Sequence, residues 1–210
     1  MRQDISAGAK FPDYVLPDHT KTPRRLSDLQ GDQLMVIVLT RGSFCPKDRQ
    51  HMLELVRFHP QFVVGYTQLV TITTDDWHTT NNYRQQTVAS WPFLYDEERI
   101  VQKDLDIKEY TDTSHDVMIP HTIVLGRDLK VFKIYNGYYY WGRPSASFAR
   151  RAARVGAPDL SRLGHYRPRT TAEMEKRRQI RLLSLRRQFN LNGRADATNG
   201  GSGRSIRGQA

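Results

Sequence analysis

An uninterrupted run of six apolar residues, 34–39, is the strongest hydrophobic feature near the start of the chain. It contains β-branched residues and no polar alternation, which is typical of a strand covered on both faces. A turn over residues 40–44 follows, and Pro46 suits the first turn of a helix because its missing N–H costs nothing there. Apolar residues at helical spacing continue this helix, and His59-Pro60 predicts its end.

The rest of the chain alternates apolar runs of strand length with periodic stretches of helical length. Before and after the first buried strand we expect a lead-in or edge strand within 9–18, a helical turn over 25–31 and a second buried strand at 68–73. A helix over about 77–89, capped by Thr74 and Asp75, comes next, followed by a strand at 91–95 and a helix at 97–105. The last predicted elements are hairpin strands at 121–125 and 131–135 and a closing helix at 145–155.

This order of elements predicts an α/β fold. A βαβαβ arrangement followed by a hairpin and a helix gives a mixed sheet with helices on both faces. Ligands in such sheets gather at the carboxyl ends of the parallel strands. The segment that follows residues 34–39 is therefore the first place to look for chemistry, and residues 118–120, before the first hairpin strand, are expected to face it.

Charge divides the chain into two parts. Of the 32 Lys and Arg residues and 22 Asp and Glu residues, residues 1–161 hold 20 and 19, whereas residues 162–210 hold 12 and 3. We therefore expect one domain over 1–160 and a basic extension over 161–210, with a helix at 171–189 and a disordered end. A basic amphipathic helix is compatible with nucleic acid or an anionic membrane surface, and equally with a solvated appendage or a dimer contact.

The composition also indicates the cellular compartment in which the protein is expected. One cysteine excludes a disulfide within the chain, the first residues lack the apolar run of a secretory signal, and no segment has the length and hydrophobicity of a membrane span. These observations predict a soluble cytoplasmic protein.

That cysteine, Cys45, lies between the first buried strand and the helix that Pro46 opens. The positive end of the helix dipole and its free N–H groups favour a thiolate, and Arg41 lies four residues upstream. A free cysteine is more often a small buried hydrophobe, so its position alone leaves the two interpretations about equal. The sequence around it favours the chemical one.

The residues around Cys45 resemble the alkyl hydroperoxide reductase and thiol-specific antioxidant branch of the peroxiredoxin-like proteins. Arg41-Gly42-x-x-Cys45-Pro46 is similar to the Arg-Gly-x-x-Cys-Pro-x-Cys motif of one subgroup, and the lead-in over residues 9–46 resembles the family's opening. Ile119-Pro120-His121-Thr122 resembles the proline loop of thioredoxins, whose cis-proline faces the reactive cysteine. The resemblance covers about residues 8–158 and implies a thioredoxin-like fold.

The chain departs from the family pattern in three ways. Asp48 stands where the subgroup has its second cysteine, and Val38 and Gly42 stand where the typical motif has proline and threonine. The family's late arginine is also missing, since Pro120 lies in its neighbourhood. The resemblance implies Cys45 as nucleophile, with Gly42, Pro46 and Pro120 forming the loops of the active site. Substitutes for the missing donors are sought among the remaining candidates, which are Thr40, Arg41, Arg127 and Arg143.

The histidines and an aromatic run are two further candidate features. Seven histidines are scattered without metal-ligand spacing, so we expect no metal and no cofactor. His121 follows Pro120, and a hydrogen-bonded structural role is favoured over one facing Cys45. The aromatic run within residues 136–145 is interpreted first as a loop packed over the sheet, and second as a surface that presents aromatic rings to a substrate or partner.

Two functions follow. The favoured one is a single-cysteine thiol oxidoreductase, in which a hydroperoxide oxidises Cys45 and an external thiol or thioredoxin-type reductant restores it. The alternative is a thioredoxin-fold binding or scaffold module without peroxidase activity, which Val38, Gly42 and Pro120 favour. A homodimer is a further expectation.

Overall fold

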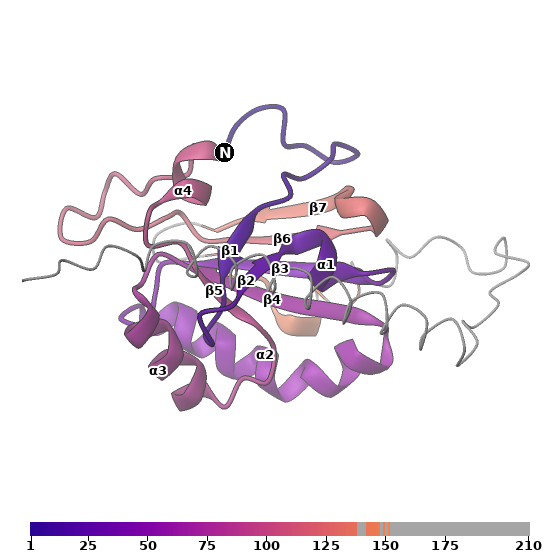
Figure 1. Cartoon of the computed structure of the whole chain (residues 1–210), viewed down its shortest axis with the longest axis horizontal. Coiled ribbons are helices and arrows are strands. Elements are labelled where there is room, and N and C mark those ends of the chain that lie inside the picture. Colours follow the sequence, from indigo (N-terminus) through magenta and orange to yellow (C-terminus); the bar gives the residue numbers. More distant parts are fainter. Residues whose placement is uncertain (138–141, 148, 150, 152–210) are drawn as a thin grey trace, which may run out of the picture. The chain divides into compact units, whose positions relative to one another are not determined.

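The computed structural model describes residues 1–137, 142–147, 149 and 151, and a five-stranded mixed sheet is its centre (Figure 1). The strand order is β5-β4-β3-β6-β7. The central strand β3 pairs in parallel with β4 and antiparallel with β6, so the sheet contains both a βαβ unit and a hairpin. The strands are β3 Leu34–Thr40, β4 Thr67–Thr73, β5 Phe93–Tyr95, β6 His121–Leu125 and β7 Val131–Asn136.

The apolar run of β3 explains its central place. All seven residues of β3 are buried, because strands flank it on both sides and helices cover both faces of the sheet. Thr40 at its end pairs with Thr73 of β4, and Leu39 pairs with His121 of β6. The last residues of β3 thus lie beside the end of β4 and the start of β6, at the edge of the sheet where α/β proteins bind their ligands.

Helices cover the sheet on two sides (Figure 1). The long helix α2, Pro46–Val64, and α3, Trp77–Thr87, pack on one face, where they share a core with alternate residues of β3 and β4. The short helices α1, Leu26–Gln30, and α4, Ile100–Asp104, pack with the N-terminal segment on the other face. The mixed sheet with helices on both faces confirms the predicted fold class.

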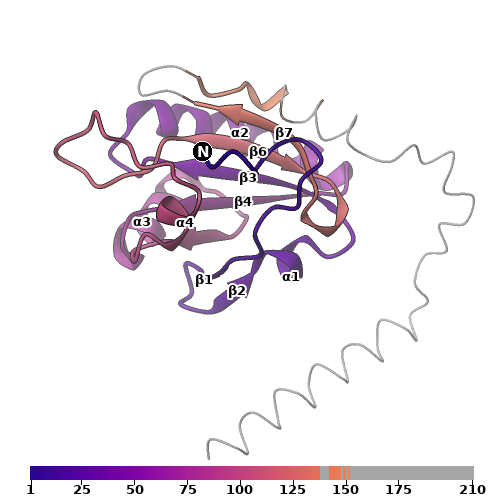
Figure 2. The same cartoon turned by 90° about the horizontal axis from the view of Figure 1, so that it is seen from above.

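The N-terminal segment differs from one of the expectations. Strands β1, Val15–Pro17, and β2, Pro23–Arg25, pair only with each other and form a separate two-stranded sheet instead of extending the main one. They lie together with α1 beside the main sheet (Figure 2). The prolines at their ends cannot donate ladder hydrogen bonds, which suits a short separate ribbon.

The predicted end of α2 and the predicted cap of α3 are wrong. Helix α2 continues through Pro60 to Val64, because Pro60 is on its exposed side while Phe62, one turn beyond Phe58, is buried in the core. Burial of the Phe62 ring outweighs the one N–H that proline removes. In α3, the cap is Asp76, whose Oδ1 accepts the Thr79 N–H at 2.7 Å, and not Thr74 or Asp75.

The predicted hairpin of β6 and β7 is confirmed, and a 3₁₀ turn at Arg127–Leu129 joins its strands. Of the closing helix expected at 145–155, residues 146, 147, 149 and 151 are helical, and the others fall outside the described residues. The aromatic residues 138–141, the domain boundary near 160 and the helix at 171–189 also lie outside them and stay predictions.

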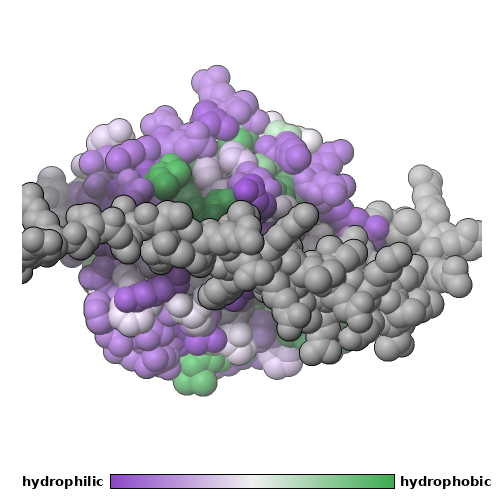
Figure 3. Space-filling model, viewed as in Figure 1, coloured by the Kyte–Doolittle hydropathy of each residue, from purple (hydrophilic) through white to green (hydrophobic). Residues whose placement is uncertain are grey.

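The described surface on the face of Figure 1 is mainly hydrophilic, with separate small hydrophobic patches (Figure 3). Among the described residues, no helix combines the length and the hydrophobicity needed to cross a membrane.

Candidate active site

Cys45 is the N-cap residue of α2, at the point where the turn after β3 enters the helix. Its side chain is only 2% exposed. Two contacts shape the turn: the Gly42 N–H donates to Thr40 Oγ1 at 3.0 Å, and the Cys45 N–H donates to the Gly42 carbonyl at 3.2 Å. Pro46 is the first helical residue, as expected. The turn therefore places Cys45 at the N-terminus of a long helix.

Glycine is favoured at residue 42 by the backbone conformation and by the Asp75 side chain that lies close to it. Its φ is +123°, a conformation that residues with a side chain rarely adopt. A Cβ atom at residue 42 would lie 2.6 Å from Oδ1 of Asp75, which follows β4. The other oxygen of Asp75 accepts the Ser43 N–H at 2.9 Å, and burial raises the pKa of this carboxyl group. Asp75 thus supports the cysteine turn, whereas the sequence had suggested a helix cap.

Two arginines flank the sulfur of Cys45. Arg41 Nη1 and Arg143 Nη2 each lie 3.8 Å from Cys45 Sγ. Arg41 comes from the turn itself and is 4% exposed. Both arginines were candidates from the sequence, and the structure brings them together at the cysteine. The two guanidinium groups thus place positive charge and N–H donors beside the sulfur.

A close approach of three chain segments places Arg143 in the site. The Gly137 N–H donates to the Pro120 carbonyl at 2.7 Å, and a Cβ atom at residue 137 would lie 2.5 Å from that oxygen and 2.8 Å from the Gly142 carbonyl oxygen. Only glycine permits this packing. The end of β7 and residue 142 therefore meet beside the start of β6, next to the end of β3.

Two carboxylates hold these arginines, and neither was selected from the sequence. Asp48, one turn into α2 and 1% exposed, accepts from Arg143 Nε at 2.5 Å and from the Arg41 N–H at 2.9 Å. Asp112 accepts from Arg41 Nη2 at 2.6 Å. Asp48 had been noticed only as the replacement of a family cysteine. In the structure it connects the turn, the helix and the segment of Arg143.

The loop that carries Asp112 also covers the turn. The ring of His115 stacks on Phe44 at 3.9 Å between ring centres, with an interplanar angle of 10°. Desolvation alone would raise the pKa of Asp112, but the N–H groups of His115 and Ser114 and the His115 side chain outweigh it and lower this pKa. Asp112 is thus held as a carboxylate facing the Arg41 guanidinium.

The remaining sequence candidates fall in different places. Pro120 lies at the same end of the sheet as Cys45, but its peptide bond is trans, so the expected cis-proline is wrong. Arg127 follows the far end of β6, five residues and about 16 Å along the strand from that end. It therefore does not belong to the Cys45 site. His121 Nδ1 bonds with the Ile119 carbonyl at 2.8 Å, which confirms the structural interpretation of this histidine.

Other buried polar groups lie close to the site. His51, on the second turn of α2, has no hydrogen-bond partner among the described residues at either ring nitrogen, and burial lowers its pKa to about 4. The buried hydroxyl of Tyr83 in α3 likewise has no partner within the described part of the chain. Among the described residues, no group of three or more His, Cys, Asp or Glu side chains is placed to hold a metal ion.

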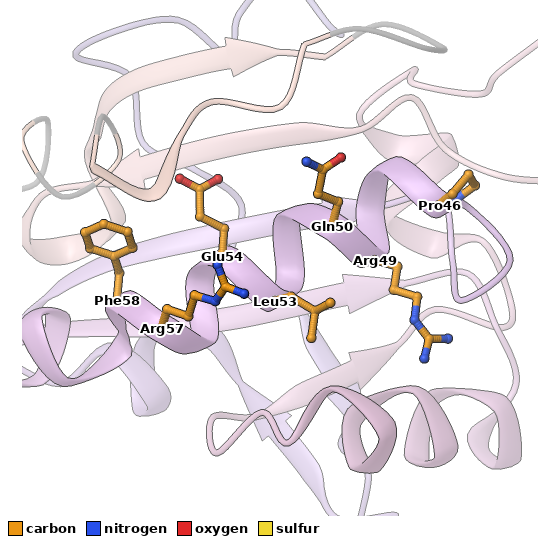
Figure 4. A pocket seen from close by; sticks show the side chains of 7 residues that line it. All are labelled: Pro46, Arg49, Gln50, Leu53, Glu54, Arg57 and Phe58. Carbon is orange, nitrogen blue, oxygen red and sulfur yellow. The ribbon is translucent and has the colours of Figure 1, made fainter.

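A groove of about 630 Å³ runs along the outer side of α2 and begins beside Cys45, at Pro46 (Figure 4). Its other lining residues are Arg49, Gln50, Leu53, Glu54, Arg57 and Phe58. Cys45 does not line it. Arg49 and Glu54 also make contacts elsewhere: Arg49 Nη1 donates to Gln86 at 3.3 Å, and Glu54 Oε1 accepts the Ala146 N–H at 3.1 Å.

Comparison with known proteins identifies the family. The model of the AhpC/TSA family matches residues 7–134, which is more than half of the chain and includes β3, the cysteine turn and most of the hairpin. The chain belongs to the AhpC/TSA family. This confirms the resemblance found in the sequence. A search of curated proteins finds no significant match to this AhpC/TSA chain.

Several solved structures share the fold of this AhpC/TSA protein. Peroxidoxin BcpB from Mycobacterium tuberculosis is 22% identical with a TM-score of 0.62, over 71% of this chain and 96% of that one. Reduced Prx3 from Vibrio vulnificus, in complex with H₂O₂, is 15% identical with a TM-score of 0.64, over 72% and 96%. The yeast mitochondrial 1-Cys peroxiredoxin is 15% identical with a TM-score of 0.62, over 78% and 84%. At these identities the likeness shows the fold.

Proposed function

We propose that this protein is a thiol peroxidase that reduces hydroperoxides through Cys45. The observation that carries the proposal is the pair of guanidinium groups of Arg41 and Arg143, each 3.8 Å from the sulfur. They supply positive charge and N–H donors where the family's usual threonine and late arginine are missing. Membership in the AhpC/TSA family supports the same chemistry.

The reaction proceeds by nucleophilic attack. The Cys45 thiolate attacks the terminal oxygen of ROOH, a sulfur–oxygen bond forms, and the O–O bond breaks with its electron pair on the leaving oxygen. The products are a sulfenic acid and RO⁻, which takes a proton from water. Arg41 and Arg143 stabilise the negative charge, which moves from sulfur to the leaving oxygen during this step.

Restoration of the thiol requires an external reductant because the chain contains no other cysteine. A first external thiol condenses with the sulfenic acid to a mixed disulfide and releases water, and a second thiol displaces Cys45 as thiol. The yeast 1-Cys peroxiredoxin, whose thiol is resolved by the glutathione and thioredoxin systems, supports testing both reductants. Asp48 occupies the place from which a second cysteine would resolve the sulfenic acid.

The test follows peroxide consumption by the full chain with glutathione or thioredoxin present. Wild type is expected to consume peroxide, and Cys45→Ser is expected to lose this activity completely. Equal slow consumption by the two proteins would favour the alternative function, a thioredoxin-fold module without peroxidase activity.

A matched pair of arginine variants tests the role of the site. Arg143→Gln removes one of the two charges beside the sulfur, so it should slow both peroxide reduction and alkylation of Cys45 by at least about tenfold. Arg127→Gln removes the same charge at the opposite end of β6 and should leave both rates unchanged. Equal effects of the two substitutions would show that net charge alone matters.

A further inference from the structure

Four backbone donors of the cysteine turn are already used. The Arg41 N–H donates to Asp48, the Gly42 N–H to Thr40 and the Ser43 N–H to Asp75. The Cys45 N–H donates to the Gly42 carbonyl. A peroxide bound at Cys45 therefore finds few free donors in this turn, and residue 42 carries no hydroxyl group.

Tyr83 supplies a donor from outside the turn. Its side chain is 1% exposed, and its hydroxyl group is buried without a hydrogen-bond partner among the described residues. An unpartnered buried hydroxyl destabilises the folded state, so folding alone does not favour it. The aromatic ring packs edge-on against Phe93 of β5, with ring centres 5.8 Å apart, and this contact needs no hydroxyl.

Tyr83 lies on the face of the sheet that the cysteine helix α2 covers. It belongs to the core that α2 and α3 share with the sheet, together with Met52 of α2 and Val38 of β3. Burial is the main cause that raises its pKa, and the negative charges of Asp48, Cys45 and Asp75 raise it further. The groups that act on this hydroxyl are thus those around the nucleophile, and it stays a neutral donor at physiological pH.

We propose that the Tyr83 hydroxyl donates a hydrogen bond to the peroxide at Cys45 and acts as a catalytic residue in the reaction proposed above. It takes the place of the missing threonine. As the sulfur attacks the terminal oxygen, the leaving oxygen gains the O–O electron pair and accepts the Tyr83 hydrogen bond. The tyrosine proton is not transferred, and RO⁻ takes its proton from water. This inference rests on the proposed function.

Tyr83→Phe is the test, because it removes the hydroxyl and keeps the ring that packs on Phe93. Two rates are measured on the full chain: reduction of H₂O₂, and alkylation of Cys45 by iodoacetamide, which needs the thiolate but no peroxide donor. Removal of one donor to a developing oxyanion typically costs about 10²–10³ in rate. We expect peroxide reduction to fall at least about tenfold and alkylation to stay within about twofold. Tyr66→Phe, at a residue that is 71% exposed, is the control and should change neither rate.

Each other outcome overturns the inference in a recognisable way. Unchanged peroxide reduction in Tyr83→Phe, with an active wild type, overturns the donor role and leaves the proposed function standing. Equal loss of both rates shows that Tyr83 acts on the thiolate instead of the peroxide. No Cys45-dependent consumption by wild type overturns the proposed function and the inference together.

Discussion

Asp48→Asn tests whether the buried ion pair beside Cys45 holds the site together. Asp48 is 1% exposed and Arg143 10% exposed at their side chains, and their atoms Oδ1 and Nε are 2.5 Å apart. Removing one member of a buried pair typically costs about 3–5 kcal/mol, because the other charge stays buried without compensation. Asparagine keeps an oxygen that can accept the Arg41 N–H, so we expect a loss near the lower limit, about 3 kcal/mol.

Urea unfolding of the full chain measures this loss. With an m value of about 2 kcal/mol/M, a loss of about 3 kcal/mol lowers the midpoint by about 1.5 M. Asp4→Asn is the matched control, because Asp4 pairs with Arg2 at 2.7 Å on the surface, where both side chains are largely exposed. It should leave the midpoint nearly unchanged. A loss below about 1 kcal/mol for Asp48→Asn would refute the reasoning, since the pair would then behave like a surface one.

Three further predictions concern stability and the basic extension. Buried His51 has a pKa of about 4 in the folded chain, against about 6.5 in the unfolded chain. Between these two pH values the unfolded chain binds more protons, so the free energy of unfolding falls as the pH falls from about 6.5 to 4. His51→Leu should reduce this slope in urea titrations at pH 7, 6 and 5, and an unchanged slope would contradict it. Asp76→Ala removes the cap of α3 and should cost about 1 kcal/mol of unfolding free energy, whereas Asp28→Ala, also in the first turn of a helix, should cost less. Any binding of DNA or anionic vesicles should reside in residues 162–210 and weaken steeply as the salt concentration rises. Replacing the arginines at 177, 178, 181, 186 and 187 by glutamine should abolish this binding. Binding that ignores salt or survives the replacement would place it elsewhere.

The sheet was readable from the sequence because its strands are apolar runs. β3 and β4 are buried on both faces, so their local composition already determines what they become. Helix ends were harder to predict. Pro60 is a strong local stop, but the burial of Phe62 depends on a core that only the folded chain forms. Tertiary packing decided this boundary against local preference.

Only part of the candidate site could be predicted from the sequence. Cys45 and Arg41 are neighbours in the chain, so the turn could be found from its motif. Arg143 and Asp112 lie 98 and 71 residues away from their partners Cys45 and Arg41, and no local pattern connects them. Asp48 carried a usable indication, since a carboxylate in the first turn of a helix after an arginine can pair with it. That pairing does not follow from the family motif, which has a cysteine at this position.

The contact between Gly42 and Asp75 makes two distant positions dependent on each other during evolution. A threonine at residue 42, as in the typical peroxiredoxin motif, would place its Cβ atom 2.6 Å from an Asp75 oxygen. Asp75 cannot be lost first without freeing the Ser43 N–H that it binds. A return to the typical threonine therefore requires the Asp75 side chain to move away from residue 42, in addition to a backbone conformation that threonine rarely adopts. An engineer who wishes to make this change has to redesign the end of β4 together with the turn.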